Sequence, residues 1–251
     1  SRRRALAPRG LRALGCALGC ALGLAAGPAA CTGAWGDERR ATSGDPAPPP
    51  QAGRLFTRLP ASYTGVRFEN RLAETREFNV FTYRNFYNGG GVAIGDLDGD
   101  GRPDLVLTAN QGGVRLYRNE GAFRFRDVSE RAGVARDDGW TTGVALADVN
   151  GDGRLDVYVC RAGNGEPAER ANLLFVNEGP DDEGVPRFRE AAERFGVADR
   201  GWSTHAVFLD HDRDGDLDLY VVNNSPRPVS SFPMRNTRAV RHEGGGDRLY
   251  R

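Results

Sequence analysis

Three short segments place oxygen-bearing side chains at a spacing that suits the binding of a cation. They span residues 96–104, 148–156 and 210–218 and align without gaps. Oxygen side chains occupy the first, third, fifth and ninth positions of each segment. The sixth position is always glycine, which lets the chain turn sharply without a Cβ clash. The oxygen-bearing residues are Asp96, Asp98, Asp100 and Asp104; Asp148, Asn150, Asp152 and Asp156; and Asp210, Asp212, Asp214 and Asp218.

Such a loop can surround one ion with oxygen atoms. Alternate side chains converge on one point, and the backbone carbonyl of the seventh residue can join them. The seventh residues are Arg102, Arg154 and Asp216. An all-oxygen cage with flexible coordination suits a hard cation, Ca²⁺ ahead of Mg²⁺. We therefore predict up to three Ca²⁺ ions, one in each loop.

Acidic loops with this composition also occur in two other contexts. Asp and Gly also make tight Asx turns without any metal. Several ionised aspartates within nine residues repel one another unless a cation is present, so three such loops in register favour metal. An EF-hand needs an acid at the twelfth position and helices on both sides. That position holds Leu107, Val159 and Val221, and the flanking sequence is β-rich, so the EF-hand is excluded.

The segments that position the loops are repeated along the chain. Each loop follows one apolar run (91–95, 143–147, 205–209) and precedes another (105–107, 157–159, 219–222). A third run at 114–121 returns at 173–179 and begins again at 248–251, and residues 125–134 match 188–197. The loops start 52 and 62 residues apart, and the extra residues fall around 180–186. Several short strands in each unit predict an all-β fold made of β-propeller blades over residues 55–251, about three repeats of an incomplete propeller.

The N-terminus has the features of an export signal. The first 30 residues contain five arginines, no acid, and an apolar run from Ala13 to Ala26, which predicts a signal peptide over 1–30. Cys31 follows two alanines, as in the lipobox of bacterial lipoproteins, and we predict that it is lipidated; simple cleavage after Ala30 is the alternative. Residues 31–54 are rich in Pro and Gly and predict a disordered tether. The expected location is extracytoplasmic, secreted or at the outer membrane or cell surface. Cys160 is then left without a partner and is expected to be a buried core residue.

The repeats resemble a known family. The matching elements are the segment from Tyr87 to Asp96, the three acidic loops, the Leu-Tyr-Arg-Asn and Phe-x-Asp-Val segments, and the Gly-Trp pairs before the later loops. They are similar to FG-GAP/VCBS repeat proteins, in particular the branch related to cartilage acidic protein that carries ASPIC/UnbV domains. The resemblance implies β-propellers with Ca²⁺ in the loop between two strands of a blade, and a role in adhesion or extracellular binding. It spans roughly residues 67–251. The resemblance includes no C-terminal ASPIC/UnbV domain, and three blades cannot close a propeller. A longer full product is therefore expected.

Two functions follow from these observations. The first is a Ca²⁺-binding, extracytoplasmic β-propeller that acts as a lipid-anchored binding or adhesion scaffold for a protein or glycan ligand at the cell surface. Its contact with the membrane would be only through the lipid. The second is a secreted enzyme, for example one acting on polysaccharide, with catalytic residues at the propeller mouth or in a missing C-terminal part. No catalytic signature was found: the histidines share no spacing with a nucleophile, and His211 is expected to point away from the ion. Trp140 and Trp202 are expected to pack between blades. The balance of 34 basic and 34 acidic residues argues against nucleic-acid binding.

Overall fold

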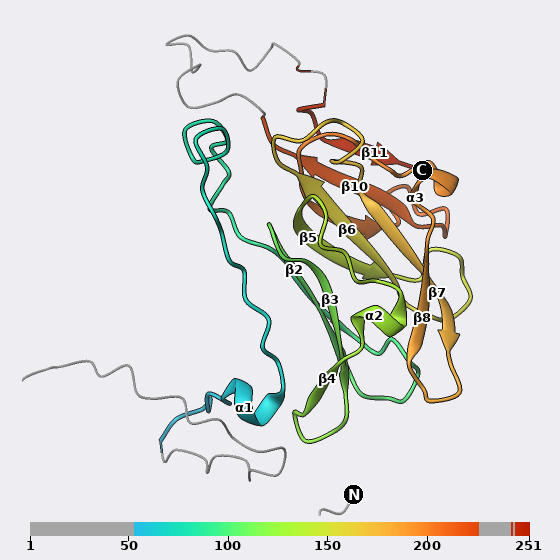
Figure 1. Cartoon of the computed structure of the whole chain (residues 1–251). Helices are drawn as coiled ribbons and strands as arrows, with labels where there is room; N and C mark the ends of the chain where they lie inside the picture. Colours follow the sequence, from blue (N-terminus) through green and yellow to red (C-terminus); the bar gives the residue numbers. More distant parts are fainter. Residues whose placement is uncertain (1–52, 226–241, 243) are drawn as a thin grey trace, which may run out of the picture. The chain divides into compact units, whose positions relative to one another are not determined.

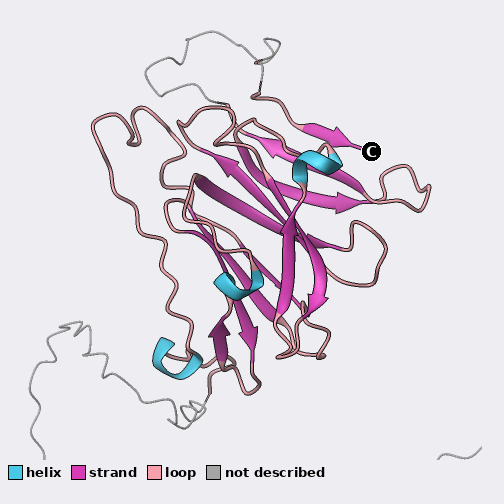
Figure 2. Ribbon diagram, turned by 45° about the vertical axis from the view of Figure 1, so that its right-hand side comes forward, coloured by secondary structure: helices cyan, strands magenta, loops and turns pink. Residues whose placement is uncertain are grey.

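The structure is a computed structural model that describes residues 53–225, 242 and 244–251. The predicted signal peptide, Cys31 and nearly all of the tether therefore lie outside the described residues. Three sheets account for most of the regular structure, and the helices are single turns (Figures 1 and 2). Among the described residues, no helix is long and apolar enough to cross a membrane.

The first two sheets are complete four-stranded antiparallel meanders, and the third has three strands in the described residues. The strands of the first sheet are β1 (Val92–Gly95), β2 (Asp104–Ala109), β3 (Gly113–Asn119) and β4 (Phe125–Asp127). Those of the second are β5 (Trp140–Ala147), β6 (Asp156–Ala162), β7 (Leu173–Pro180) and β8 (Pro186–Glu190). Those of the third are β9 (Ser203–Leu209), β10 (Asp218–Asn223) and β11 (Arg248–Tyr250). The all-β, incomplete propeller predicted from the repeats is confirmed.

Short turns connect these strands at the same places in each repeat. Gly121 and Gly179 both adopt a φ of +91°, and each donates its N–H to the side chain of the asparagine two residues earlier, at 2.9 Å. The extra residues of the second repeat lengthen the β7–β8 hairpin, as the sequence indicated. The helices are α1 (Ala61–Thr64), α2 (Ser129–Ala132) and α3 (Ala192–Phe195), and each ends at a glycine with positive φ. None of the three was predicted, because four residues are too few to show a helical period.

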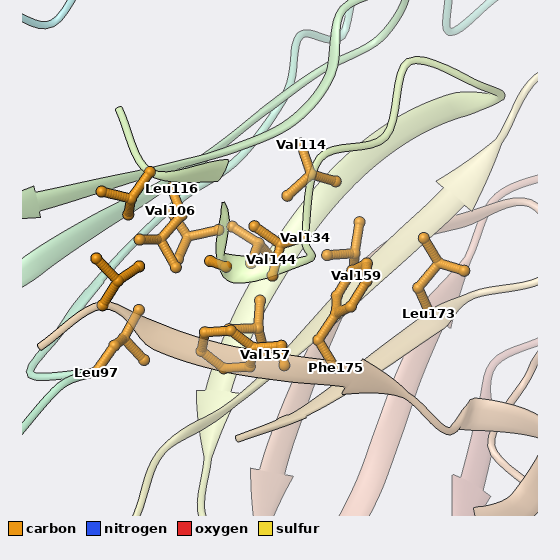
Figure 3. Packing of buried hydrophobic residues seen from close by; sticks show 14 residues of the cluster. Leu97, Val106, Val114, Leu116, Val134, Val144, Val157, Val159, Leu173 and Phe175 are labelled. Carbon is orange, nitrogen blue, oxygen red and sulfur yellow. The ribbon is translucent and has the colours of Figure 1, made fainter. Parts of the chain in front are cut away.

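Two apolar clusters join the sheets face to face. Val106 and Leu116 of the first sheet pack with Val157, Val159 and Phe175 of the second (Figure 3). On the other face of the second sheet, a second cluster reaches the third sheet. It includes Tyr158, Cys160, Leu174 and Val176 of the second sheet and Ala206, Leu219 and Val221 of the third. Cys160 is buried and free, as expected, and burial raises the pKa of its thiol.

The three equivalent second strands show how position in the stack decides burial. Every residue of β6 is buried, because both faces of its sheet are covered. In β2, Leu105 and Leu107 are half-buried while Val106 between them is buried. In β10 the exposed residue is Tyr220, on the face away from the second sheet. The strands therefore share one sequence pattern but differ in how many faces are covered.

The segment before β1 packs against the start of the second sheet. Phe78, Tyr83 and Phe86 surround the Trp140 ring, with centroid separations of 4.7, 5.7 and 5.1 Å. Trp140 therefore packs against residues 78–86, in a cluster that Trp202 joins from the start of the third repeat. Trp202 does bridge two sheets: its Nε1 donates to the Gly163 carbonyl, just after β6, at 3.0 Å.

Candidate metal centre

Each acidic loop connects the first two strands of a sheet. The three loops therefore begin at the C-terminal ends of β1, β5 and β9. The strands are antiparallel and in register up to the loop; for example Gly95 pairs with Asp104 and Ala147 with Asp156. The first and ninth acids are thereby brought close together by strand pairing. The loop between them must reverse direction within seven residues, which accounts for the glycines with positive φ at 99, 101, 151, 153 and 215.

The first acid of each loop holds the turn together. Asp96 accepts hydrogen bonds from the backbone N–H groups of Gly99 and Gly101, both at 2.8 Å. Asp148 accepts from Asp152 at 3.1 Å and Gly153 at 2.8 Å. These N–H groups, that of Gly153 foremost, lower the pKa of Asp148. Asp210 repeats the arrangement with its own fifth and sixth residues.

The ninth acid is buried and joins the loop to the sheet. Asp104 accepts from the N–H of Leu97 at 3.0 Å and from that of Asn119, at the end of β3, at 2.8 Å. Asp156 makes the same pair of bonds to Val149 at 2.9 Å and Asn177 at 2.7 Å. Burial raises the pKa of Asp104 to about 6 and also raises that of Asp156. Each oxygen of a carboxylate has a second lone pair, so these bonds leave room for a metal ion.

In the first loop three of the predicted ligands converge. Asp96, Asp98 and Asp104 offer carboxylate oxygens that all lie within 4.8 Å of one another, and the Asp98 side chain is only 1% exposed. Asp100 does not join this group; its carboxylate pairs with Arg102 instead. The donors are all oxygen atoms from short side chains on one turn, and this donor set fits a hard divalent cation.

The second loop follows the same hydrogen-bonding plan with one amide. Asn150 stands where the first loop has Asp98, and its Oδ1 accepts from the N–H of Asp152 at 3.0 Å. Asp152 pairs with Arg154 at 2.5 Å, as Asp100 does with Arg102. This loop therefore offers one fewer carboxylate near the first and ninth acids.

The third loop is more open and contains a histidine. Asp210, Asp212 and Asp214 form one close group of carboxylates, and His211, Asp212 and Asp218 form another. The His211 Nδ1 lies 2.5 Å from the Asp218 Oδ2, and its backbone N–H donates to the same oxygen at 2.9 Å. These two contacts lower the pKa of Asp218. The expectation that His211 points away from the ligands is wrong, because its ring folds back onto the ninth acid.

Arginines supply positive charge to the loops, whereas the loop sequences alone predicted that only a bound cation would do so. Arg118 of β3 donates from Nε to Asp98 at 2.5 Å and lies 3.6 Å from Asp100. Arg251 pairs with Asp212 and lies 3.9 Å from Asp214. Of the seventh residues, Arg102 and Arg154 also donate from Nε to the carbonyls of Asn119 and Asn177. Asp216 donates its N–H to Asp214. The loops are thus held both by Asx-type hydrogen bonds and by ion pairs.

Residues outside the loops complete the site, and sequence reasoning did not single them out. The backbone N–H groups of Asn119 and Asn177 donate to the ninth acids of the first and second loops. The Asn177 Nδ2 also donates to the Leu97 carbonyl, which belongs to the neighbouring repeat, at 2.9 Å. Their recurrence in the Asn-Glu-Gly segments of two repeats was a signal that could have found them. Arg118 and Arg251 end the same Leu-Tyr-Arg segment in two repeats, and this recurrence was a comparable signal.

A catalytic centre away from the loops would need a close group of titratable or metal-binding side chains elsewhere in the fold. Among the described residues, every close group of three or more potential metal ligands lies in the first or third loop. His205 lines a cavity together with apolar residues of β1, β5 and β9, the first strand of each sheet.

Comparisons with known proteins agree with the repeats. Residues 96–159 match the FG-GAP-like repeat family, and this segment runs from the first loop into β6. Human cartilage acidic protein 1 is 30% identical over 161 residues, which is 63% of this chain and 22% of that protein. The mouse protein of that name is 30% identical over 162 residues, and the Xenopus tropicalis protein is 31% identical over 154 residues. The predicted resemblance to FG-GAP repeat proteins related to cartilage acidic protein is confirmed. The chain spans less than a quarter of the length of these relatives.

Proposed function

We propose that this protein is a Ca²⁺-binding, extracytoplasmic scaffold of propeller type that presents a surface to a protein or glycan ligand. The convergence of Asp96, Asp98 and Asp104 on one point is the observation that carries the calcium part of the proposal. The ion would neutralise carboxylates that otherwise depend on Arg118 for positive charge. Because the loop connects two strands inside one sheet, bound Ca²⁺ would act as a structural ion that stabilises the folded state.

The location rests on the sequence and on the likeness to cartilage acidic protein 1. A signal peptide over 1–30 would export the chain, and lipidation of Cys31 would give it its one contact with a membrane. Residues 31–54 would then hold the sheets away from that membrane. Nucleic acid is not expected as a partner, since the chain has no net positive charge.

Thermal unfolding of the full chain tests the calcium proposal. We expect the midpoint to rise with Ca²⁺, to rise less with Mg²⁺, and to return to its starting value with chelator. A ligand at 100 times its Kd that binds only the folded state adds about 2.7 kcal/mol to the free energy of unfolding. A cooperatively folded sample whose midpoint is the same in Ca²⁺ and chelator would show that the loops are Asx turns only.

Variants assign the effect to the loops. Replacing the third residue of each loop at once (Asp98→Ala, Asn150→Ala, Asp212→Ala) should abolish the calcium-dependent rise. Asp182→Ala changes an exposed acid in the β7–β8 hairpin and should leave the rise intact. A rise that survives the triple replacement would place the ion elsewhere.

A further inference from the structure

A second candidate site lies at the ends of β5 and β9 that are opposite to the acidic loops. A cavity of ≈ 260 Å³ lies there between residues 83–90 and the starts of β5 and β9. Thr142 and Gly143 line it from β5, and Thr204 from β9. The loops follow the far ends of the same strands, so the cavity shares no residue with the metal centre.

The lining of this cavity is polar but uncharged. Its side chains are two hydroxyl groups, one phenol and two amides, and no charged side chain is among the described residues that line it. These side chains belong to Tyr83, Asn85, Asn88, Thr142 and Thr204. Hydroxyl and amide groups can both donate and accept hydrogen bonds, so the lining suits a ligand that does the same.

One of these groups is left without a partner. Asn85 is 7% exposed, and its Nδ2 makes no hydrogen bond among the described residues. An unpaired buried donor costs about 1–3 kcal/mol, and a ligand oxygen that accepts from it recovers that free energy. The two threonine hydroxyls, in contrast, already donate: that of Thr142 to the Ser203 carbonyl at 2.7 Å and that of Thr204 to the Val222 carbonyl at 3.2 Å, so each has only its acceptor capacity left for a ligand.

The cavity is built on closely packed backbone and a fixed aromatic wall. A Cβ on Gly90 would lie 1.7 Å from the Thr108 carbonyl oxygen, and one on Gly143 would lie 2.5 Å from that of Thr204. The chain can approach this closely only because both residues are glycine. Tyr83 is held edge-on against Trp140, and its burial raises its pKa to about 12, so the phenol stays neutral. The site therefore exists before any ligand arrives.

We infer that this cavity binds a single neutral sugar unit. The ring hydroxyls of a sugar match the hydroxyl and amide lining, and one of them would accept from Asn85. The volume lies below the roughly 300–1,000 Å³ of sites for larger ligands, which suits one ring. A carboxylate or phosphate would find no cation in the lining to replace its water. This inference names the ligand class of the scaffold proposed above and rests on that binding role.

Binding of simple glycosides to the full chain in Ca²⁺ tests the inference. The probes are the methyl glycosides of glucose, galactose, mannose and N-acetylglucosamine, with glucuronate and inorganic phosphate as charged comparators. We expect saturation-transfer NMR to detect at least one neutral glycoside and neither charged comparator. If all four glycosides fail to bind a chain that Ca²⁺ stabilises, the sugar site is wrong and the calcium scaffold stands.

Variants locate the binding. Asn85→Leu should weaken the glycoside about tenfold, which corresponds to one hydrogen bond of about 1.4 kcal/mol. Thr204→Val keeps the shape of the side chain and should weaken glycoside binding less than Asn85→Leu does. It is the second cavity variant, to be used if Asn85→Leu lowers the melting temperature. Asn164→Leu, an exposed asparagine that lines a different cavity, is the matched control and should bind normally. Unchanged affinity in both cavity variants would overturn the assignment.

Discussion

The first and third acidic loops have the same spacing but different surroundings. In the first, Asp98 is almost completely buried and the fourth residue is Gly99, with a φ of +79°. In the third, Asp212 is partly exposed and the fourth residue is Arg213, which must adopt a φ of +63°. The second residue also differs: Leu97 is part of the core between two sheets, whereas His211 turns onto Asp218. A shared ligand spacing therefore produces a closed site where a neighbouring sheet covers the loop and a looser site where none of the described residues does.

Removal of the ninth acid should give the largest difference in stability between the first and third loops when no metal is present. Asp104→Ala would leave the N–H groups of Leu97 and Asn119 unpaired in a buried place, and we expect it to lower the free energy of unfolding by about 3 kcal/mol. Asp218→Ala should cost about 1 kcal/mol, because its partner His211 is accessible to water. Urea unfolding in chelator measures both. Asp104→Asn keeps one acceptor and should fall between them; equal losses at the two positions would remove the distinction between the loops.

The second-largest difference between the first and third loops should lie in the stability that calcium adds. Asp98→Ala is expected to remove most of the contribution of the first site, up to about 2.7 kcal/mol at 100 times Kd, while Asp212→Ala removes less. The reason is that the buried Asp98 carboxylate gains more from an ion than one that water already solvates. Urea unfolding with and without Ca²⁺ gives the difference. Asp98→Asn, which copies the second loop, should retain part of the effect; a larger loss for Asp212→Ala would reverse the proposed order.

The histidine of the third loop should limit its affinity for calcium. His211→Leu introduces the residue type found at position 97 and frees the Asp218 oxygen that the ring contacts. We expect calcium to bind the third loop about tenfold more tightly, a change of about 1.4 kcal/mol. Calorimetric titration of this variant in an Asp98→Ala background isolates the third site from the first. Weaker binding would identify His211 as a helper of the site instead of a competitor.

The smallest effect should come from backbone strain at the fourth position. An added Cβ at Gly99 would meet no atom within 4 Å, so Gly99→Arg tests conformational cost alone, and we expect a loss of about 1 kcal/mol. Arg213→Gly should gain about 0.5 kcal/mol, since the greater freedom of glycine in the unfolded chain offsets part of the relief. Thermal unfolding in chelator checks both. A stabilising Gly99→Arg would contradict the strain explanation.

The repeat pattern determined the architecture of this protein by itself. Apolar runs on either side of each acidic loop predicted paired strands, and these appear as β1–β2, β5–β6 and β9–β10. The start of a third copy at 248–251 became β11. These features are local: a strand pair with a tight turn is specified by alternation and by glycine within about twenty residues. Burial of Cys160 followed in the same way, because it ends an apolar run.

Tertiary structure alone decided which ligands converge and what neutralises them. Arg118 lies twenty positions beyond Asp98 and reaches it only because β3 pairs with β2. Sequence spacing treats the three loops alike, but burial of Asp98 and the turn of His211 depend on what packs beside each loop. The cover over Trp140 comes from residues 78–86, and its partners could not be deduced from the repeat, since that segment belongs to none. Contacts between sheets are set by which face is covered, and a single repeat does not encode its neighbours.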